Sequence, residues 1–328
     1  MSINIAINGF GRIGRAAFKA AAENKKINIV AINDLTDART LAHLLKYDTV
    51  YGIYDKKISN GLDFILINNK KIPVYGEADP KKLPWKKLKV DVVLECTGRF
   101  TKKEDANGHI KAGAKKVIIS APTKSENLVT IVKGVNESAG KKETIISNAS
   151  CTTNCIAPIM KVLEKEFGVK KSLVTAIHSY TSTQNLVDSP HKDLRRTRAA
   201  AVNMIPTTTG AAIATCKTLP SLENKFDGIA IRVPTIAVSI SDITAVLNKP
   251  TTVEKINSAF IKASKTYLRD ILNVTEEPLV SSDFIGNPYS AIVDLNLTKL
   301  VADDLVKIIA WYDNEWAYAL RMVEIASE

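Results

Sequence analysis

The sequence predicts two α/β domains: a doubly wound parallel sheet, followed by an α+β domain built on a large, mainly antiparallel sheet. A length of 328 residues exceeds what one hydrophobic core usually organises, so two domains are expected. Short apolar runs alternate with helical patterns through the first half, whereas long β-rich runs with few helices fill the second half.

In the first half, continuous apolar strands separated by helices are typical of a parallel sheet that helices cover on both faces. This pattern predicts a doubly wound domain over residues 1–150. The expected strands are 3–8, 27–33, 90–95, 116–120 and 144–147, and the expected helices are 15–23 and 38–46.

The second domain is expected over residues 151–313. Pro234 interrupts one of its β-rich runs and predicts a strand break there. The last helical segment, 314–328, is expected to pack back onto the first domain. The expected strands of the second domain are 173–181, 229–247, 289–298 and 305–312, and its expected helices are 152–167 and 252–267.

Composition restricts the class of protein. Hydrophobic residues make up 45% of the chain, charged residues 24%, and no apolar stretch approaches eighteen residues, so no membrane span is expected. The N-terminus leads directly into a strand, so no secretory signal is expected. Four cysteines form no disulfide framework in a chain of this size. Together these features predict a cytoplasmic protein whose cysteines stay reduced.

The chain is basic, with 45 Lys and Arg against 34 Asp and Glu and a formal charge of +11. Such an excess attracts anions, either small phosphorylated metabolites or a nucleic acid. No nucleic-acid module accompanies the charge, and aromatic residues make up only 6% of the chain. Small anions are therefore the favoured partners, and no specific nucleic acid is expected.

A glycine motif follows the first predicted strand. Gly9, Gly11 and Gly14 form G-x-G-x-x-G at the start of a helix. Such glycines allow a tight turn, close approach of a pyrophosphate and close packing of helix on strand. Asp34, twenty residues on, can accept hydrogen bonds from ribose hydroxyls and repel a 2′-phosphate, which favours NAD over NADP. The alternative is that Asp34 only caps the following segment.

A second motif lies at the predicted domain boundary. Small and polar residues from Ser147 precede an apolar periodic run, so a helix should begin near Cys151. A thiol at a helix N-terminus is expected to have a lowered pKa and to act as a nucleophile. Cys155, one turn on, should pack inward. No spacing of cysteine and histidine completes a metal site, so no metal is expected.

A nucleophilic thiol needs a base, and His178 near the end of a predicted strand is the preferred candidate. Strand ends commonly support site residues, and hydroxyl side chains follow His178 directly. His43, His109 and His191 are rivals. His43 and His109 lie in polar helical segments and are expected at the surface.

Several motifs together resemble the glyceraldehyde-3-phosphate dehydrogenase family. They occur in the family's order and span essentially the whole chain; the cysteine motif is the most specific of them. The resemblance implies a Rossmann NAD-binding domain, a catalytic domain and a homotetramer, in which the loop 180–201 packs against a neighbouring subunit. The matching segments are 8–15, 149–155, 178–181, 207–212, 232–235 and 311–316.

The resemblance also implies a mechanism. The Cys151 thiolate attacks the aldehyde carbon of glyceraldehyde 3-phosphate to give a hemithioacetal, and His178 accepts its hydroxyl proton during oxidation by NAD. Inorganic phosphate then displaces the resulting thioester. The backbone N–H of Cys151 and the His178 ring stabilise the oxyanion.

Binding residues follow from the same resemblance. Thr181, Thr183, Arg195 and Arg232 are expected to contact the substrate phosphate. Ser150, Thr152, Thr209, Gly210 and Arg232 are expected to contact the attacking phosphate. The residues expected to line the NAD site are Asn8, Gly9, Phe10, Gly11, Arg12, Ile13, Gly14, Asp34, Thr97, Gly98, Phe100, Ser120 and Asn314.

Three alternatives remain open at this point. A dehydrogenase acting on erythrose 4-phosphate would share the cysteine and histidine motifs. A semialdehyde dehydrogenase would leave the phosphate-binding residues unexplained. From a different class, the basic charge could mark a nucleic-acid-binding protein on a dehydrogenase scaffold, which a steep fall of affinity with salt would reveal.

Overall fold

The computed structural model describes residues 2–123 and 125–328, which divide into two compact units. Unit 1 comprises Met1–Ile131, Ser138–Ala149 and Tyr318–Glu328, and unit 2 comprises Val132–Glu137 and Ser150–Ala317. Each unit contains one large sheet, so the predicted fold class is confirmed. Among the described helices, none is both long and apolar enough to cross a membrane.

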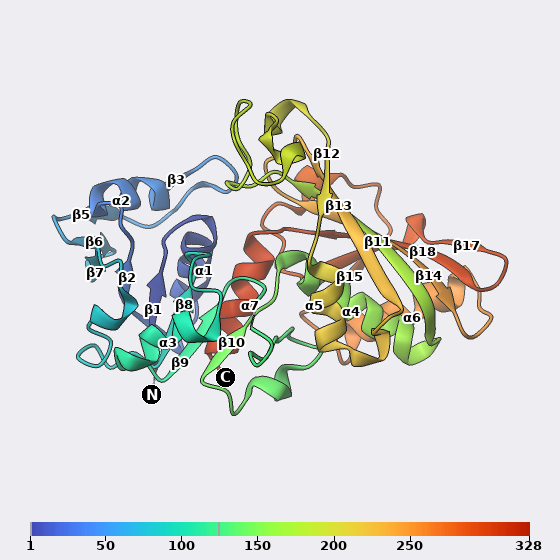
Figure 1. Cartoon of the computed structure of the whole chain (residues 1–328), viewed down its shortest axis with the longest axis horizontal. Coiled ribbons are helices and arrows are strands. Elements are labelled where there is room, and N and C mark those ends of the chain that lie inside the picture. The colour runs from blue at the N-terminus through green and yellow to red at the C-terminus, as the bar shows by residue number, and fades with distance from the viewer. Residues whose placement is uncertain (1, 124) are drawn as a thin grey trace. The chain divides into compact units, whose positions relative to one another are not determined.

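Unit 1 is a Rossmann-type sheet in the order β10-β9-β8-β1-β2-β7-β6-β5 (Figure 1). The first six strands of this order run parallel, and the two at the β5 edge pair antiparallel. The strands are β1 (Ile3–Asn8), β2 (Ile27–Asn33), β5 (Ile58–Asn60), β6 (Phe64–Ile67), β7 (Lys70–Tyr75), β8 (Val92–Glu95), β9 (Lys116–Ile119) and β10 (Ile145–Ser147), with a separate hairpin of β3 (Tyr47–Asp48) and β4 (Gly52–Ile53).

Helices α1 (Arg12–Ala22), α2 (Ala38–Lys46) and α3 (Lys103–Lys111) belong to this unit. Helix α2 starts because Asp37 accepts a hydrogen bond from the backbone of Thr40. Around Trp85, a core of side chains from β8, β9 and α3 is fully buried. The strands β5–β7 were not predicted, because they are short and carry Lys and Asn in place of a continuous apolar run.

Unit 2 has the sheet order β12-β13-β11-β14-β18-β16-β15, with β17 paired to β18. Only β11 with β13 and β15 with β16 pair parallel, so the sheet is mainly antiparallel, as predicted. Its strands are β11 (Val169–Ser179), β12 (Ile205–Thr208), β13 (Phe226–Val233), β14 (Ser239–Leu247), β15 (Leu272–Thr275), β16 (Ala291–Asp294), β17 (Lys299–Val301) and β18 (Leu305–Tyr312).

Three helices of unit 2 cover one face of this sheet: α4 (Cys151–Glu166), α5 (Ala211–Thr218) and α6 (Val253–Lys265) (Figure 1). Apolar side chains from β11, β14 and β18 pack against them in one core. The predicted break at Pro234 is present, since β13 ends at Val233 and β14 begins at Ser239. Helix α7 (Trp316–Ala326) belongs to unit 1 from Tyr318 onward.

Candidate active site and dinucleotide cradle

Helix α4 begins at Cys151, at the position expected from the sequence. Ser150 caps the helix by accepting a hydrogen bond from the Thr153 backbone N–H at 3.0 Å. Before it, Ala149 has a left-handed φ of 55°, which costs about 1–2 kcal/mol for a residue with a Cβ. The Tyr318 hydroxyl donates to the Ala149 carbonyl at 3.0 Å. The turn that presents Cys151 is therefore fixed on both sides.

Cys151 and His178 are in direct contact. The distance from Sγ of Cys151 to Nε2 of His178, near the end of β11, is 3.4 Å. The rival histidines lie elsewhere: His43 is exposed beside Tyr47, and His191 bonds locally to Asp193. The expectation that His109 lies at the surface is wrong, because the ring is fully buried in unit 1.

The expected low thiol pKa is not found. Burial raises the pKa of the Cys151 thiol, and the positive charge of Arg232 opposes this shift without overcoming it. Burial, with the charge of Arg232, lowers the pKa of His178 to about 3. Both shifts favour the neutral forms of the thiol and the imidazole, since desolvation disfavours a charged group. Burial also raises the pKa of Cys155, to about 12, in line with its expected packing role.

Arg232 lies beside His178 because β13 pairs with β11 in the register His178 to Arg232. Its Nη1 is 2.8 Å from Nδ1 of His178 and 3.0 Å from the Ser179 carbonyl oxygen, which is itself 2.7 Å from Nδ1. A ring protonated on Nδ1 donates to the Ser179 carbonyl and leaves Nε2 free to accept the thiol proton. A ring that accepts from Arg232 at Nδ1 carries its proton on Nε2 and is no base toward Cys151.

The predicted phosphate-binding residues are only partly brought together. Thr152 is adjacent to Cys151, and its hydroxyl is 2.9 Å from the Tyr312 hydroxyl. The hydroxyls of Thr181 and Thr183 lie 2.9 Å apart just after β11. Thr209 and Gly210 precede α5, where the Thr209 hydroxyl accepts a hydrogen bond from the Ala211 N–H. Arg195 lies in an exposed 3₁₀ turn, Leu194–Thr197.

Two residues of this region were missed by sequence reasoning. Tyr312 is buried against Thr152 and the His178 ring. The Ser239 hydroxyl accepts from the Ser179 N–H and donates to the side-chain oxygen of Asn314, both at 3.2 Å. Ser239 thus links the strand that carries His178 to Asn314. In the sequence of β14, Ser239 and Ser241 share a face with Ile243 and Leu247, and polar residues on that apolar face are a signal that could have indicated Ser239.

In unit 1, the three motif glycines have distinct surroundings. Gly9 has φ +89°, and a Cβ there would lie 2.7 Å from the Thr97 nitrogen. A Cβ on Gly14 would lie 2.1 Å from the carbonyl oxygen of Gly9. A Cβ on Gly11 would meet nothing within 4 Å. The first and third glycines are therefore required by packing, whereas the second leaves open space at the N-terminus of α1.

Asp34 follows β2 and contacts the glycine turn directly. Its carboxylate accepts from the Phe10 N–H at 2.7 Å and from the Thr36 N–H at 2.9 Å. Asp37 is the residue that caps α2, whereas Asp34 bonds both the following segment, at Thr36, and the glycine turn, at Phe10. Arg12 directs its guanidinium to Asp48 at 2.7 Å. The remaining predicted residues lie around β8 and β9: Thr97, Gly98 and Phe100 follow β8, and Ser120 follows β9.

The fold defines a class: an oxidoreductase with a Rossmann-type cofactor domain that acts on an aldehyde group. Comparison with known proteins supports this class. The family model described as glyceraldehyde 3-phosphate dehydrogenase, NAD binding domain, matches residues 3–103. The one described as glyceraldehyde 3-phosphate dehydrogenase, C-terminal domain, matches residues 150–314.

Full-length relatives agree as well. The chain is 52% identical to glyceraldehyde-3-phosphate dehydrogenase of Geobacillus stearothermophilus over 329 residues, covering 100% of this chain and 98% of that protein. It is 50% identical to glyceraldehyde-3-phosphate dehydrogenase 2 of Bacillus subtilis over 327 residues, 99% of this chain and 96% of that protein. The chain therefore belongs to the glyceraldehyde-3-phosphate dehydrogenase family, and its cofactor is NAD.

Proposed function

We propose that the chain oxidises D-glyceraldehyde 3-phosphate to 1,3-bisphosphoglycerate with NAD and inorganic phosphate. Cys151 is the nucleophile and His178 the base. The observation that carries this proposal is the 3.4 Å contact between the Cys151 thiol and Nε2 of His178, at the N-terminus of α4. The family match and full-length relatives named for this activity support it.

The first step joins the thiol to the aldehyde. Sγ of Cys151 bonds to the carbonyl carbon, while Nε2 of His178 takes the thiol proton and returns it to the substrate oxygen, giving a hemithioacetal. His178 begins this step as a neutral base because burial lowers its pKa to about 3. The Cys151 backbone N–H, free at the first turn of α4, stabilises the developing oxyanion.

Oxidation and release follow. NAD, when bound, supplies the acceptor for a hydride from the hemithioacetal carbon. His178 removes the hydroxyl proton as the carbonyl reforms, which leaves a thioester on Cys151. A phosphate oxygen then attacks the thioester carbon, the carbon–sulfur bond breaks, and the sulfur leaves as thiolate.

Two anion sites serve this chemistry. We assign Thr181, Thr183, Arg195 and Arg232 to the substrate phosphate. Ser150, Thr152, Thr209, Gly210 and, again, Arg232 are assigned to the attacking phosphate. Guanidinium groups, hydroxyls and backbone N–H groups are suited to phosphate oxygens. Arg232 serves both sites from a position already in contact with His178.

The cofactor is assigned to the carboxyl edge of the unit 1 sheet. Glycine-turn residues 8–14 would hold the pyrophosphate and Asp34 the ribose hydroxyls, supported by the open space at Gly11. Asn314 of unit 2 is assigned to the carboxamide of the cofactor. The other residues assigned to the cofactor are Thr97, Gly98, Phe100 and Ser120.

Unit 1 is proposed as the NAD-binding domain and unit 2 as the catalytic domain of a homotetramer located in the cytoplasm. Exposed apolar side chains support self-association: Leu186 and Val187 in the loop 180–201, and Leu173 and Ile229 on the open face of the unit 2 sheet.

The covalent intermediate tests the proposed chemistry directly. The protein is mixed with NAD and glyceraldehyde 3-phosphate without inorganic phosphate, quenched in acid and digested for mass spectrometry. The expected adduct is a phosphoglyceroyl group on Cys151, absent from Cys151→Ser. An adduct on Cys155 or Cys216, or none on Cys151, would refute the assignment.

A further inference from the structure

A chain of buried polar side chains crosses the carboxyl edge of the unit 1 sheet. Glu95, Asn8 and Asn33 are the last residues of β8, β1 and β2, which are neighbours in the sheet. All three are at least 96% buried. Polar side chains at these positions are costly unless hydrogen-bonded, so their partners matter.

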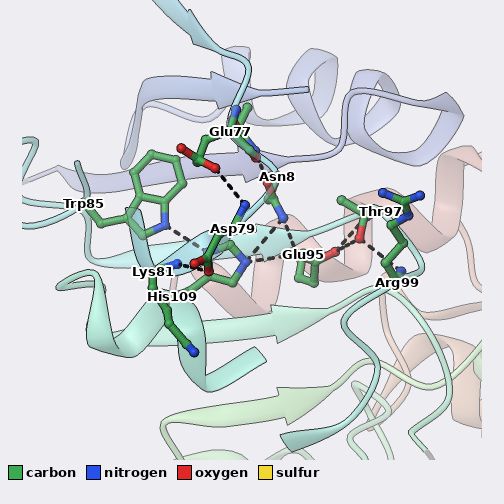
Figure 2. A network of polar contacts seen from close by, with 10 residues as sticks. Asn8, Glu77, Asp79, Lys81, Trp85, Glu95, Thr97, Arg99 and His109 are labelled. Carbon is green, nitrogen blue, oxygen red and sulfur yellow. Dashed lines mark hydrogen bonds and ion pairs between the residues drawn. The ribbon is translucent and has the colours of Figure 1, made fainter. Parts of the chain in front are cut away.

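Glu95 is the centre of this chain (Figure 2). One carboxylate oxygen accepts from the Asn8 amide at 2.5 Å and lies 3.0 Å from Nε2 of His109. The other accepts from the Thr97 backbone N–H at 2.8 Å and from the Thr97 hydroxyl. Four donors therefore meet one carboxylate that is only 1% exposed.

His109 is oriented by a second donor. The Trp85 indole N–H donates to Nδ1 of His109 at 2.9 Å, so this nitrogen carries a lone pair. The ring proton is then on Nε2, from which it is donated to Glu95 (Figure 2). Both residues are fully buried. His109 thereby helps to fix the orientation of the Glu95 carboxylate.

The chain also fixes the orientation of Asn8. Its side-chain oxygen accepts from the Asn33 amide at 2.6 Å, while its amide nitrogen donates to Glu95. Asn33 is held in turn by the backbone of Glu77, whose N–H donates to it at 2.9 Å. Asn8 directly precedes Gly9, and Thr97 is the residue that a Cβ on Gly9 would strike. Glu95 thus accepts hydrogen bonds from residues on both sides of the glycine turn, Asn8 and Thr97.

We propose that Glu95, oriented by His109, is a positioning residue for NAD: it holds the glycine turn and the Thr97 turn in the conformation that receives the dinucleotide. This inference rests on the proposed assignment of the cofactor to that edge. A carboxylate is used because it can accept from all four donors at once. An amide cannot, since its NH₂ group would face N–H donors on one side.

The test measures equilibrium NAD binding in the Glu95→Gln variant by titration calorimetry. The expected result is a dissociation constant raised by about 10- to 100-fold, the effect of losing hydrogen bonds to a charged group. The rate at which iodoacetamide alkylates Cys151 without NAD, and the KM for the triose phosphate at saturating NAD, should stay at wild-type values because unit 2 is unchanged.

Asp91→Asn is the matched control, since Asp91 precedes β8 and Glu95 ends it. Its carboxylate also accepts a backbone N–H, that of Asn4 at 2.8 Å, and bonds Lys115 at 2.7 Å. This variant should lower the melting temperature without changing NAD affinity. If Glu95→Gln lowers the melting temperature but binds NAD like the wild type, Glu95 is only structural and the proposal is wrong.

A pair of His109 variants covers the case in which Glu95→Gln does not fold. His109→Phe keeps the ring beside Trp85 and removes the donor, whereas His109→Gln retains an N–H that can reach Glu95. Weaker NAD binding in the first and recovery in the second is expected; equal affinity in both would overturn the proposal. Wild-type affinity in Gly11→Ala would instead refute the cofactor assignment itself.

Discussion

Burial raises the pKa of the Cys151 thiol and lowers that of the His178 imidazole, and both shifts favour the neutral forms of these groups. An ion pair at rest would need the site to solvate two charges in a buried position. A neutral pair avoids that cost and moves the proton only as the carbon–sulfur bond forms. At the scale of residues, the proposed mechanism makes His178 a base through its position beside the thiol, in the tautomer that carries its proton on Nδ1, rather than through a stored charge.

Replacing His178 by Asn tests this role. The amide cannot accept and carry the proton, so acylation should slow by about 10²–10⁴-fold, the usual contribution of a general base. Rapid-quench measurement of the burst of NADH gives the acylation rate separately from release. A burst at the wild-type rate would place the base elsewhere.

The low pKa of His178 also predicts an acid effect on stability. Between about pH 6.5 and 3, the unfolded chain binds a proton at this residue and the folded chain does not. Stability contributed by the neutral histidine is therefore present above pH 6.5 and lost as pH falls, by up to about 1.4 kcal/mol per pH unit. Urea unfolding of wild type and His178→Asn at pH 7 and 5 checks this. The free energy of unfolding of the wild type relative to that of the variant should be smaller at pH 5 than at pH 7. A difference that is the same at both pH values would contradict the lowered pKa of His178.

Residue roles differ in how far they could be predicted from the sequence. Cys151 and His178 stand in short, distinctive motifs, and the helix start at Cys151 follows from local capping chemistry. The partners of Glu95 could not be predicted, because they are distant in sequence. His109 lies fourteen residues from Glu95 and Asn8 lies eighty-seven, and only the tertiary fold brings them together. The fall in thiol pKa was predicted wrongly because local helix geometry gives no measure of burial.

At the scale of elements, the turn from β1 to α1 separates packing from binding. Gly14→Ala places a Cβ 2.1 Å from a backbone oxygen and should destabilise the protein by about 1–3 kcal/mol. Gly11→Ala meets open space and should cost less than about 1 kcal/mol, while it weakens NAD binding by about tenfold or more. Chemical denaturation and NAD titration of both variants distinguish the two effects. Equal stability losses would contradict the assigned roles.

The long elements were predicted well where one period of burial dominates. Helix 38–46 and strand 305–312 have the predicted limits, and α1 and α4 shift by a few residues. The expected strand at 289–298 is shorter, because the chain turns into a 3₁₀ helix, Leu295–Leu297, after Asp294. Strand order and register could not be predicted, since they depend on pairing between residues far apart in sequence.

At the scale of the whole molecule, the open face of the unit 2 sheet predicts self-association. Leu173 and Ile229, on the adjacent strands β11 and β13, are 64% and 49% exposed, and a cavity of about 1120 Å³ lies beside Leu173 and Leu305. Burying such a face in a homotetramer removes it from water. The double variant Leu173→Asp, Ile229→Asp should sediment as a smaller species than the wild type. An unchanged sedimentation coefficient would remove this face from the interface.

The central claim is that a cysteine thioester is released by inorganic phosphate. The most direct test follows NADH formation from glyceraldehyde 3-phosphate with and without phosphate, with erythrose 4-phosphate in parallel. The account predicts steady turnover of the triose phosphate only when phosphate is present, and little turnover of the tetrose. A rate that is the same with and without phosphate, and higher with erythrose 4-phosphate than with the triose phosphate, would contradict the assigned substrate and phosphate site. It would leave the proposed cysteine chemistry intact.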